Sequence, residues 1–465
     1  MIARPAPRAY RPGMAKSSDA RPARQIKLGM FLRPAGHHLA GWRHPRSQAD
    51  AGVNFKHFVE VARLAERGLF DMLFSADSAT ANAVFKDDGL RRMSYVAWIE
   101  PFTLLAGLAA VTTNIGLVCT ASTTYEEPFS LARKFASLDH VSGGRAGWNL
   151  VTSGNHTAAL NFSREFHPPK HERYRRAEEF ADVVSGLWDS WDDDAFIRDR
   201  ESGIFFDPKK LHTLGHKGEH FCVMGPLNVA RSPQGRPVLV QAGASEEGKE
   251  LAARTAEVIF AAAPTLREGQ TFYADVKGRM AKYGRNRDAL KIMPGFFVTV
   301  GRTREEAREK REHLQSLIHP EVGLALLEQR TGLDFSGYDY DAPFPQLDMG
   351  EINSSRQTLI ADMAKKNNFT IRQTWQAIAG GRGHFDVYGS PGDIADVMEQ
   401  WISEDAADGF NIMPPVMPGG LEDFVDLVVP ELQRRGLFRT QYEGTTLREN
   451  LGLMRPPSRY ATEKA

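Results

Sequence analysis

The sequence predicts an α/β protein folded as a (β/α)8 TIM barrel, with insertions after strands four and seven. Eight short apolar runs of strand length alternate with amphipathic helical patterns along the chain. Such alternation is typical of parallel sheets, and eight strands that are each followed by a helix favour a closed barrel over an open sheet. The 465 residues suffice for one large domain with insertions or for two domains.

The predicted strands and helices follow one another in order. The first strand precedes a helix in which Phe55, Phe58 and Ala62 recur at helical spacing, and the later units repeat this pairing. A long helix separates the fourth strand from the fifth. The predicted strands cover residues 26–32, 69–77, 115–123, 146–152, 238–243, 258–263, 293–300 and 410–416, and the helices cover about 54–67, 101–112, 128–140, 172–191, 246–256, 266–283 and 421–436.

Two segments do not fit this rhythm. Residues 196–236 carry many Gly, Pro and His residues, and residues 319–386 are mixed, with helical patterns near 357–366 and 371–379. We expect both to be insertions that build lids and substrate walls; the alternative is decoration or oligomer contacts. The predicted domain therefore spans 26–453, between a disordered N-terminal tail (1–25) and a C-terminal tail (454–465).

Composition excludes several classes of protein. Lys plus Arg and Asp plus Glu both number 58, so the chain lacks the basic footprint of a nucleic-acid-binding protein. Cys119 and Cys222 form neither a disulfide framework nor a zinc spacing, which favours a reducing, cytoplasmic setting. No apolar run is long enough to span a membrane, and the first 25 residues lack the apolar core of a secretory signal. A start at Met14 and a transit peptide stay open.

The most informative stretch is SGGRAGWNLVTSGN, residues 142–155. Small residues at Gly143, Gly144 and Gly147 allow a tight turn and keep backbone bulk low where the strand begins. The strand then ends in polar groups, which is how a barrel strand delivers side chains such as Asn149 to a ligand.

Polar groups also follow other predicted strands, and their convergence on one mouth predicts a pocket. For any one of them the alternative is a helix cap, since Ser, Thr and Asp are preferred N-cap residues. The groups are Asp77 and Ser78 after the second strand, 120–124 at the third, 149–153 at the fourth and 243–245 at the fifth.

AGASEEGKE, residues 242–250, nearly matches a P-loop, but Glu250 stands where the magnesium-binding hydroxyl would be. A single phosphate at this helix N-terminus is the better interpretation, with N–H groups near Gly243 and Ala244 and the hydroxyl of Ser245 as donors. The two glutamates at 246 and 247 would repel an anion if they turned inward, although acidic residues in a first turn also suit the helix dipole.

GHHLAGWRHP, residues 36–45, places His37, His38 and His44 after the first strand. Adjacent histidines point apart and no carboxylate or thiolate pattern accompanies them, so we expect no metal site. One histidine could supply a proton in catalysis, and the alternative is that each anchors the loop. Further along, HERYRRAEEF opens a helix with His171 and Tyr174, one face of which could contact an anion.

Several motifs in fixed order resemble the nitrilotriacetate and dibenzothiophene-sulfone monooxygenase branch of the bacterial luciferase-like flavoproteins. The resemblance covers about residues 26–453, and SGGRAGWNLVTS is its strongest part. The other motifs are GHHLAGWRHP, LFSADS, IGLVCTASTTYEEPFSLARKFASLDHV, HERYRRAEEF with LWDSW, QAGASEEG, GSPGDIADVMEQW and DGFNIMPPVMPGGLEDFVDLVVPELQRRGLFR.

This resemblance implies a TIM barrel and a two-component, FMN-dependent monooxygenase. A separate NAD(P)H:flavin reductase would supply reduced FMN, and dioxygen would form a flavin hydroperoxide that oxygenates a small organic substrate. By motif, Asp77, Thr123 and Asn149 would meet the isoalloxazine ring. Tyr174 and Ser245, with His171 nearby, would hold the phosphate.

Rival functions are a deazaflavin-dependent oxidoreductase on the same barrel and a non-catalytic flavin-binding protein. The resemblance also implies a homodimer or homotetramer, and it leaves the substrate open. Arg372 and Arg382 are candidate partners for an anionic substrate.

Overall fold

The computed structural model describes residues 24–81, 87–335, 337–345, 355–381 and 383–461. Most of the predicted N-terminal tail lies outside these residues. Arg24, at its end, belongs to the folded part, because its guanidinium donates to the hydroxyl of Tyr273 at 2.9 Å and pairs with Asp405 at 2.5 Å.

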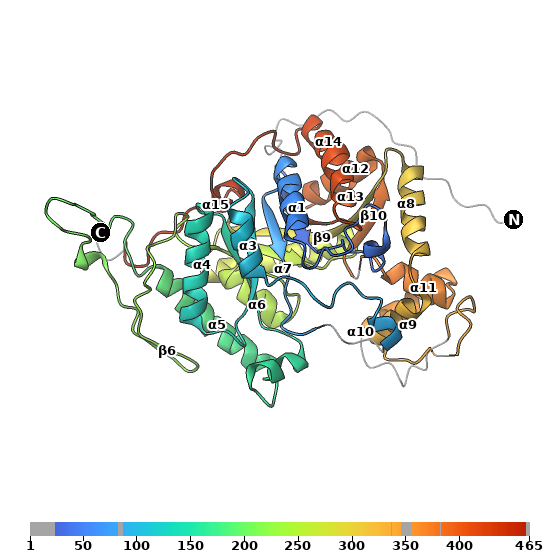
Figure 1. Ribbon diagram of the computed structural model, residues 1–465, viewed down its shortest axis with the longest axis horizontal. Coiled ribbons are helices and arrows are strands. Elements are labelled where there is room, and N and C mark those ends of the chain that lie inside the picture. The colour runs from blue at the N-terminus through green and yellow to red at the C-terminus, as the bar shows by residue number, and fades with distance from the viewer. Residues whose placement is uncertain (1–23, 82–86, 336, 346–354, 382, 462–465) are drawn as a thin grey trace.

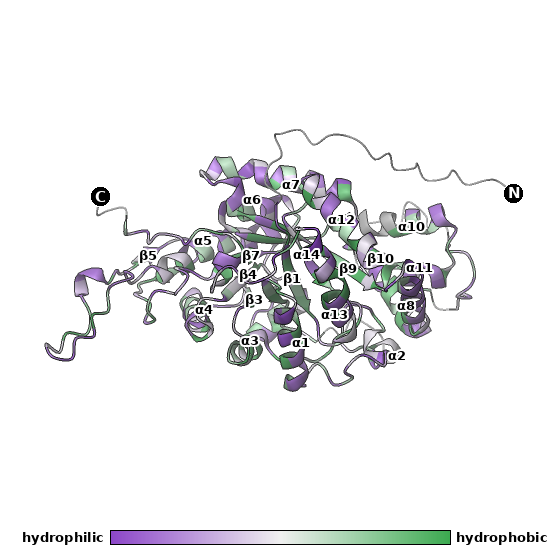
Figure 2. Cartoon of the chain, turned by 90° about the horizontal axis from the view of Figure 1, so that it is seen from above, coloured by the Kyte–Doolittle hydropathy of each residue, from purple (hydrophilic) through white to green (hydrophobic). Residues whose placement is uncertain are grey.

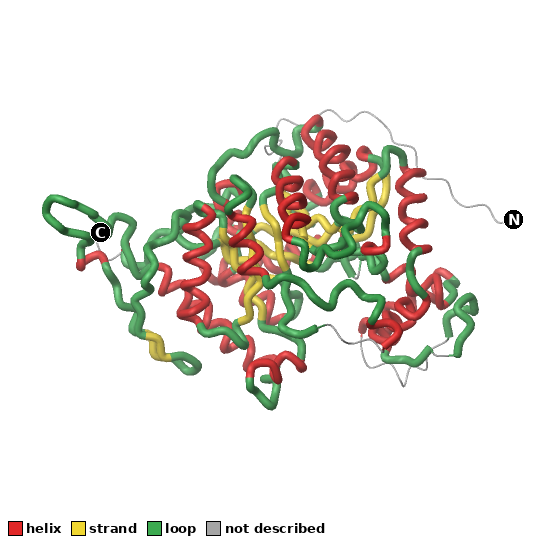
Figure 3. The backbone as a smooth tube through the Cα atoms, in the orientation of Figure 1, coloured by secondary structure: helices red, strands yellow, loops and turns green. Residues whose placement is uncertain are grey.

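Eight parallel strands close into a barrel at the centre of the molecule (Figure 3). Each strand pairs with the next one along the chain, and β11 returns to pair with β1. All eight predicted strands are therefore confirmed. They are β1 (Lys27–Leu32), β2 (Met72–Ser75), β3 (Gly116–Ser122), β4 (Ala146–Val151), β7 (Val238–Gln241), β8 (Val258–Ala261), β9 (Lys291–Val300) and β11 (Gly409–Met413).

Helices surround the barrel (Figure 1), and the predicted helices are present. Their bounds are α1 (Phe55–Arg67), α2 (Asp87–Leu90), α3 (Pro101–Ala109), α4 (Pro128–Ser142), α5 (Lys170–Trp188), α6 (Glu246–Thr255), α7 (Leu266–Arg279), α8 (Arg304–Ser316), α9 (Pro320–Thr331), α10 (Ser355–Asn367), α11 (Ile371–Ile378), α12 (Pro391–Ser403), α13 (Gly419–Asp423), α14 (Val429–Arg434) and α15 (Leu447–Asn450). Among the described residues, no helix is both long and apolar enough to cross a membrane.

Successive side chains of a strand point to opposite faces, so the barrel strands contribute to two cores. One core lies inside the barrel, and the other lies between the barrel and the helix layer. Trp148 of β4 points outward and packs with Phe135, Phe180 and Trp188 of the helix layer. The inward side chains are mostly aromatic and branched, and Figure 2 shows the apolar strands at the centre. The inner core comprises Phe31, Met72, Phe74, Val118, Val238, Val240, Val258, Met293, Phe297 and Met413.

The C-terminal segment seals the amino-terminal end of the barrel. Leu447 of α15 is fully buried in the inner core, and Leu451 lies there as well. The packing is close at two predicted positions: a Cβ on Gly144 (φ +93°) would lie 2.8 Å from Thr446, and a Cβ on Gly147 would lie 3.0 Å from Val118. The predicted need for low backbone bulk is confirmed there, whereas Gly143 (φ +69°) has open space around it and serves the turn through its backbone conformation.

The first irregular segment leaves the barrel at this sealed end. It lies between α5 and β7, and because α5 runs antiparallel to β4, residues 189–237 begin and end at the amino side of the sheet. The segment projects away from the barrel and carries the small pair β5 (His216–Lys217) and β6 (Cys222–Val223) (Figure 1). No residue of this segment lines either of the two cavities described below, and its expected role as a substrate wall stays a prediction.

The other two segments outside the barrel rhythm pack against the main body. Residues 319–386 follow β9 and α8, and this insertion contains α9, α10 and α11. At its end begins β10 (Phe385–Gly389), which pairs with the second half of β9, past the residues that pair with β8. The end of the chain, expected to be a tail, packs on the projecting segment: Arg455 pairs with Asp193 at 2.6 Å, and the Tyr460 ring stacks on His212 at 4.1 Å.

We expect Leu447→Ala to lower the free energy of unfolding by about 2–5 kcal/mol, because it leaves a cavity where the inner core is sealed. Urea titration followed by tryptophan fluorescence measures this change. Met454→Ala, at a side chain that is 90% exposed, is the matched control and should be nearly neutral. Equal effects of the two substitutions would contradict the sealing role of Leu447.

Candidate active site

Strand β4 is fixed at its first residues by two buried charged side chains. Arg145 donates hydrogen bonds to the carbonyl groups of Ala109, Thr112, Ile115 and Ser142, at 2.7–3.0 Å. These bonds tie β4 to the end of α3 and to the start of β3, so the strand's register does not depend on its own sheet bonds alone.

Asp139 of α4 anchors the same point from the other side. Its Oδ1 accepts from the backbone N–H of Ala146 at 3.0 Å and from Gln234 Nε2 at 2.7 Å. The Gln234 side chain also donates to the Ala146 carbonyl at 2.7 Å. Burial is the largest influence on Asp139 and raises the pKa of its carboxyl to about 6.

The result is a defined orientation for Asn149, an inward side chain of β4 that is 3% exposed. Its Nδ2 donates to Thr120 Oγ1 at 2.7 Å, and the Thr120 hydroxyl donates to the Ser75 carbonyl at 2.7 Å. This chain of donors fixes which way the amide points. The Asn149 Oδ1 atom is buried without a hydrogen-bond partner in the protein, so it can accept from a donor group of a ligand.

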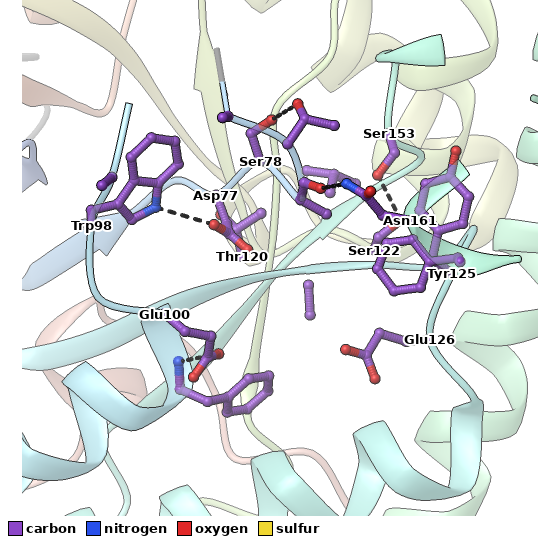
Figure 4. Close-up of a pocket in the computed structure, with 18 of the residues that line it drawn as sticks. Asp77, Ser78, Trp98, Glu100, Thr120, Ser122, Tyr125, Glu126, Ser153 and Asn161 are labelled. Atoms are coloured by element: carbon purple, nitrogen blue, oxygen red, sulfur yellow. Dashed lines mark hydrogen bonds between the residues drawn. The ribbon is translucent and has the colours of Figure 1, made fainter. Parts of the chain in front are cut away.

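A cavity of about 500 Å³ opens where β2, β3 and β4 end, as the sequence predicted for the carboxyl side of the barrel. Figure 4 shows Asp77 and Trp98 on one side and Ser122, Tyr125 and Ser153 on the other. The indole N–H of Trp98 donates to Asp77 Oδ1 at 3.3 Å. Desolvation in this wall raises the pKa of the Asp77 carboxyl.

Two long segments form much of the cavity wall, and the sequence patterns singled out only their first residues. They are the described residues of 76–100, after β2, and of 152–169, after β4. They are joined by Asn155 Nδ2, which donates to Thr80 Oγ1 at 2.6 Å, and by Asn161 Nδ2, which donates to the Ala79 carbonyl at 2.8 Å. The length of these segments could have marked them as functional from the sequence, because most connections in compact domains are much shorter.

The other carboxylates of the cavity already have partners. Glu100 caps α3 and accepts from the N–H groups of Phe102 and Thr103 at 2.7 and 2.9 Å. Glu126 pairs with Lys134 at 3.2 Å.

A second, smaller cavity of about 100 Å³ adjoins the first and shares Asp77, Ser78 and Trp98 with it. It lies beside the end of β1, where Arg33 contributes the only lysine or arginine among the described residues that line either cavity. The guanidinium carbon lies 4.3 Å from the centre of the Tyr95 ring. No sequence pattern pointed to Arg33.

Tyr174 and Ser245 meet at the N-terminus of α6, which follows β7. Ser245 is the N-cap: its Oγ accepts from the Gly248 N–H at 3.2 Å and donates to the Tyr174 hydroxyl at 3.3 Å. The proton of Tyr174 is thus available to a ligand, together with the unpaired N–H groups of the first helical turn. A Cβ placed on Gly243 would meet only Tyr174 and Gly248, both at 3.8 Å, and the neighbouring Ala244 is exposed.

The two glutamates of this helix pair with basic side chains, and the Glu247 carboxylate also lies close enough to the Ser245 hydroxyl for that hydroxyl to help lower its pKa. Glu246 pairs with Arg279 and Lys249, and Glu247 pairs with Lys170 at 2.7 Å. The hydrogen bond from Lys170 is the largest cause that lowers the pKa of Glu247, to about 2. His171 lies one helical turn before Tyr174 and is exposed.

Thr123 lies behind the cavity wall and is fully buried. Its hydroxyl donates to the Val151 carbonyl at 3.2 Å, and its N–H bonds to the same oxygen at 2.9 Å. Thr120, three residues earlier on β3, is the threonine that reaches the cavity.

The three candidate catalytic histidines line neither cavity. His37 donates from Nε2 to the Phe31 carbonyl at 2.9 Å, and the backbone N–H groups of His37 and His38 bond to Pro414 and Pro415. His44 lies 5.5 Å from the His313 ring of α8, and burial, His313 and Arg46 lower its pKa. These contacts support the loop-anchoring alternative.

Two further expectations concern charged groups. Among the described residues, no cluster of three or more His, Cys, Asp or Glu side chains could hold a metal ion. Arg372, a candidate for an anionic substrate, pairs with Asp341 at 2.8 Å, and Arg382 lies outside the described residues.

Comparison with known sequences gives consistent matches. The profile of the family described as "Luciferase-like monooxygenase" matches residues 35–400. The chain is 54% identical to N-acetyl-S-(2-succino)cysteine monooxygenase of Bacillus subtilis, with 94% of this chain and 99% of the relative covered. It is 50% identical to nitrilotriacetate monooxygenase component A of Aminobacter aminovorans (94% and 98% covered) and 39% identical to dibenzothiophene-sulfone monooxygenase of Rhodococcus erythropolis (93% and 98% covered).

Solved structures agree with the sequence matches. The crystal structure of DmoA from Hyphomicrobium sulfonivorans superposes with a TM-score of 0.83 at 35% identity, with 92% of each chain covered. The coenzyme F420-dependent tetrahydromethanopterin reductase of Methanopyrus kandleri gives a TM-score of 0.54 at 14% identity over 88% of this chain and 99% of that chain, a likeness that shows the shared fold alone.

The buried carboxyl of Asp139 predicts a measurable pH dependence of stability. Because its folded pKa is raised to about 6, the folded state binds more protons than the unfolded state between about pH 4 and 6, and stability falls as pH rises through this range. Asp139→Asn removes this contribution. The difference in unfolding free energy between the variant and the wild type should shift by about 2–3 kcal/mol in favour of the variant from pH 4 to pH 7. Parallel urea-denaturation curves at both pH values would contradict the assignment.

Proposed function

The chain belongs to the luciferase-like monooxygenase family, and we propose that it is the oxygenating component of a two-component system that uses reduced FMN and dioxygen. The predicted resemblance, the TIM barrel and the monooxygenase class are confirmed by the family match and the relatives. The relationship to F420-dependent enzymes is distant, so the deazaflavin alternative loses support.

One observation carries the proposal: an unsatisfied amide and an anion site lie on the same side of the barrel mouth. The Asn149 Oδ1 atom has no partner inside the barrel, and the Tyr174 and Ser245 hydroxyls meet at the N-terminus of α6. β4 and β7 are neighbours, so these groups flank one interstrand position. Their chemistry fits a cofactor with a hydrogen-bonding ring and a phosphate.

The phosphate end needs no metal in this arrangement. Helix N-termini attract anions through free N–H groups and the helix dipole; the Tyr174 hydroxyl adds a direct donor, and the Ser245 hydroxyl adds a second when its proton turns from Tyr174 to the anion. Glu247 lies beside Ser245, and its ion pair with Lys170 offsets its negative charge at this point. Gly243 leaves the approach open, and His171 lies on the same face of α5 as Tyr174.

The ring end would lie toward Asn149, Thr120 and Asp77, at the ends of three adjacent strands. We propose these three side chains as the ring contacts; the position of Thr123 behind the wall supports a structural role for its side chain. Reduced FMN supplies the electrons and the position at which dioxygen reacts. The chain's own residues bind and orient the flavin and limit the access of water.

We propose two kinds of partner: a flavin reductase, from the way the flavin would be held, and further copies of this chain, from exposed apolar side chains. A flavin that must arrive reduced and leave oxidised suits a site without covalent or metal bonds, and a separate NAD(P)H:flavin reductase is the proposed source. The relative named component A supports a multi-component system. A homodimer or homotetramer is proposed as well, and the exposed Ile204, Phe205 and Met224 of the projecting segment support a contact between subunits.

The substrate proposed is a small organic molecule with a sulfur or nitrogen atom at its centre. The two relatives with at least 50% identity are named for N-acetyl-S-(2-succino)cysteine and nitrilotriacetate, which are both of this kind. Both compounds are therefore the first probes for activity.

Labelled dioxygen tests the reaction. With FMN, a flavin reductase and NADH, we expect one ¹⁸O atom from ¹⁸O₂ in the oxidised product of at least one probe and the other in water. Turnover with a deazaflavin and no label would favour the dehydrogenase alternative. Tightly held oxidised FMN without substrate-dependent oxygen uptake would favour a flavin-binding protein without turnover.

Tyr174→Phe and Ser245→Ala should each weaken FMN binding by about 10–100-fold, since each removes a hydrogen bond to a charged group. Riboflavin lacks the phosphate, so its affinity should change by less than about twofold. Quenching of flavin fluorescence measures both affinities, and Tyr388→Phe on β10 is the matched control. If FMN and riboflavin lose affinity together, the phosphate is not held here.

A further inference from the structure

Arg33 is the first residue after β1, where the strand ends at the barrel mouth. Its guanidinium packs over the Tyr95 ring at 4.3 Å and approaches the Phe31 ring at 6.0 Å. Tyr95 is itself fixed, because it is 5% exposed and its hydroxyl donates to the Gly36 carbonyl. The position of the guanidinium is therefore determined by the fold, not by a surface ion pair.

No carboxylate of the described residues forms an ion pair with Arg33, although many other described arginines have one. The nearest acidic wall residue, Asp77, accepts from Trp98 instead. Glu100 and Glu126 are occupied by the α3 N-terminus and by Lys134. An anion that enters either cavity thus meets one cation with unused donors.

The strand order separates Arg33 from the flavin phosphate site. Around the closed barrel the order is β1-β2-β3-β4-β7-β8-β9-β11, so the gap between β4 and β7 lies on the far side from β1. A flavin that extends from Tyr174 and Ser245 toward Asn149 and Asp77 would present its ring between these two sides. Arg33 is therefore placed to contact the substrate and not the cofactor phosphate.

The small cavity beside Arg33 limits what can accompany the anion. It holds about 100 Å³, against about 500 Å³ for the cavity that it adjoins, and most of its wall is apolar. Phe58, Ile99 and Leu104 contribute from the helix layer. A short uncharged group such as methyl or acetyl suits this space.

We propose that Arg33 binds a carboxylate of the substrate and selects carboxylate-bearing substrates with a short uncharged group next to it. This inference rests on the proposed function, because it assigns the substrate class of the same site. Arginine suits this role because its planar fork makes two parallel hydrogen bonds to a carboxylate, and lysine cannot reproduce that geometry.

The test compares a charged probe with its neutral counterpart. The probes are N-acetyl-S-(2-succino)cysteine and its trimethyl ester, in which all three carboxylates are capped. We expect Arg33→Gln to raise both the KM and the calorimetric Kd for the free acid by about 10–100-fold, and Arg33→Lys to raise them less. The ester should respond by less than about twofold, and Arg200→Gln, on the exposed projecting segment, should change nothing.

Three results would overturn the inference: equal losses for acid and ester, no loss in Arg33→Gln, or a wild-type protein that binds only the ester. Calorimetry measures binding without turnover, so it tests the carboxylate site at Arg33 separately from the proposed oxygenase activity. Binding of the acid that depends on Arg33, without ¹⁸O incorporation from any probe, would support the carboxylate site and contradict the oxygenase. Incorporation of ¹⁸O that is unchanged in Arg33→Gln would support the oxygenase and contradict the carboxylate site.

Discussion

Closing eight parallel strands into a ring brings every carboxyl end to one mouth and leaves no free edge. The rest of the structure depends on this constraint. Because side chains alternate, Trp148 joins the helix layer while Asn149 enters the barrel, and a shift of one residue would exchange them. The bonds of Arg145 and Asp139 to the start of β4 hold this register, which makes the position of the unsatisfied amide a consequence of buried contacts far from it.

The two ends of the barrel have different roles. Leu447 and its neighbours seal the amino end, so ligands can enter only from the carboxyl end. At that end the charges are divided among separate positions. The anion site of α6 lies beside β4, the cavity carboxylates are mostly occupied, and Arg33 lies across the mouth. Such a division lets a dianionic cofactor and an anionic substrate bind without meeting the same group.

Sequence patterns predicted all eight strands, because periodicity is a local property, whereas only the family resemblance implied that Tyr174 and Ser245 act at one site. The patterns did not predict Arg33, since an arginine after a strand is common and its lack of an ion pair is visible only in three dimensions. Likewise, only the antiparallel course of α5 shows that residues 189–237 leave from the sealed end. Thr120 and Thr123 differ in position because side chains alternate along β3, which ends at Ser122, so positions three residues apart face opposite sides.

The central claim is that the flavin lies across this mouth with its phosphate between β4 and β7. A crystal structure of the chain with bound FMN tests it most directly. We expect the phosphate within hydrogen-bonding distance of the Tyr174 and Ser245 hydroxyls and the ring beside Asn149, with Arg33 free beyond the ring. A phosphate beyond β9 and β11, the more frequent position in such barrels, would contradict this placement.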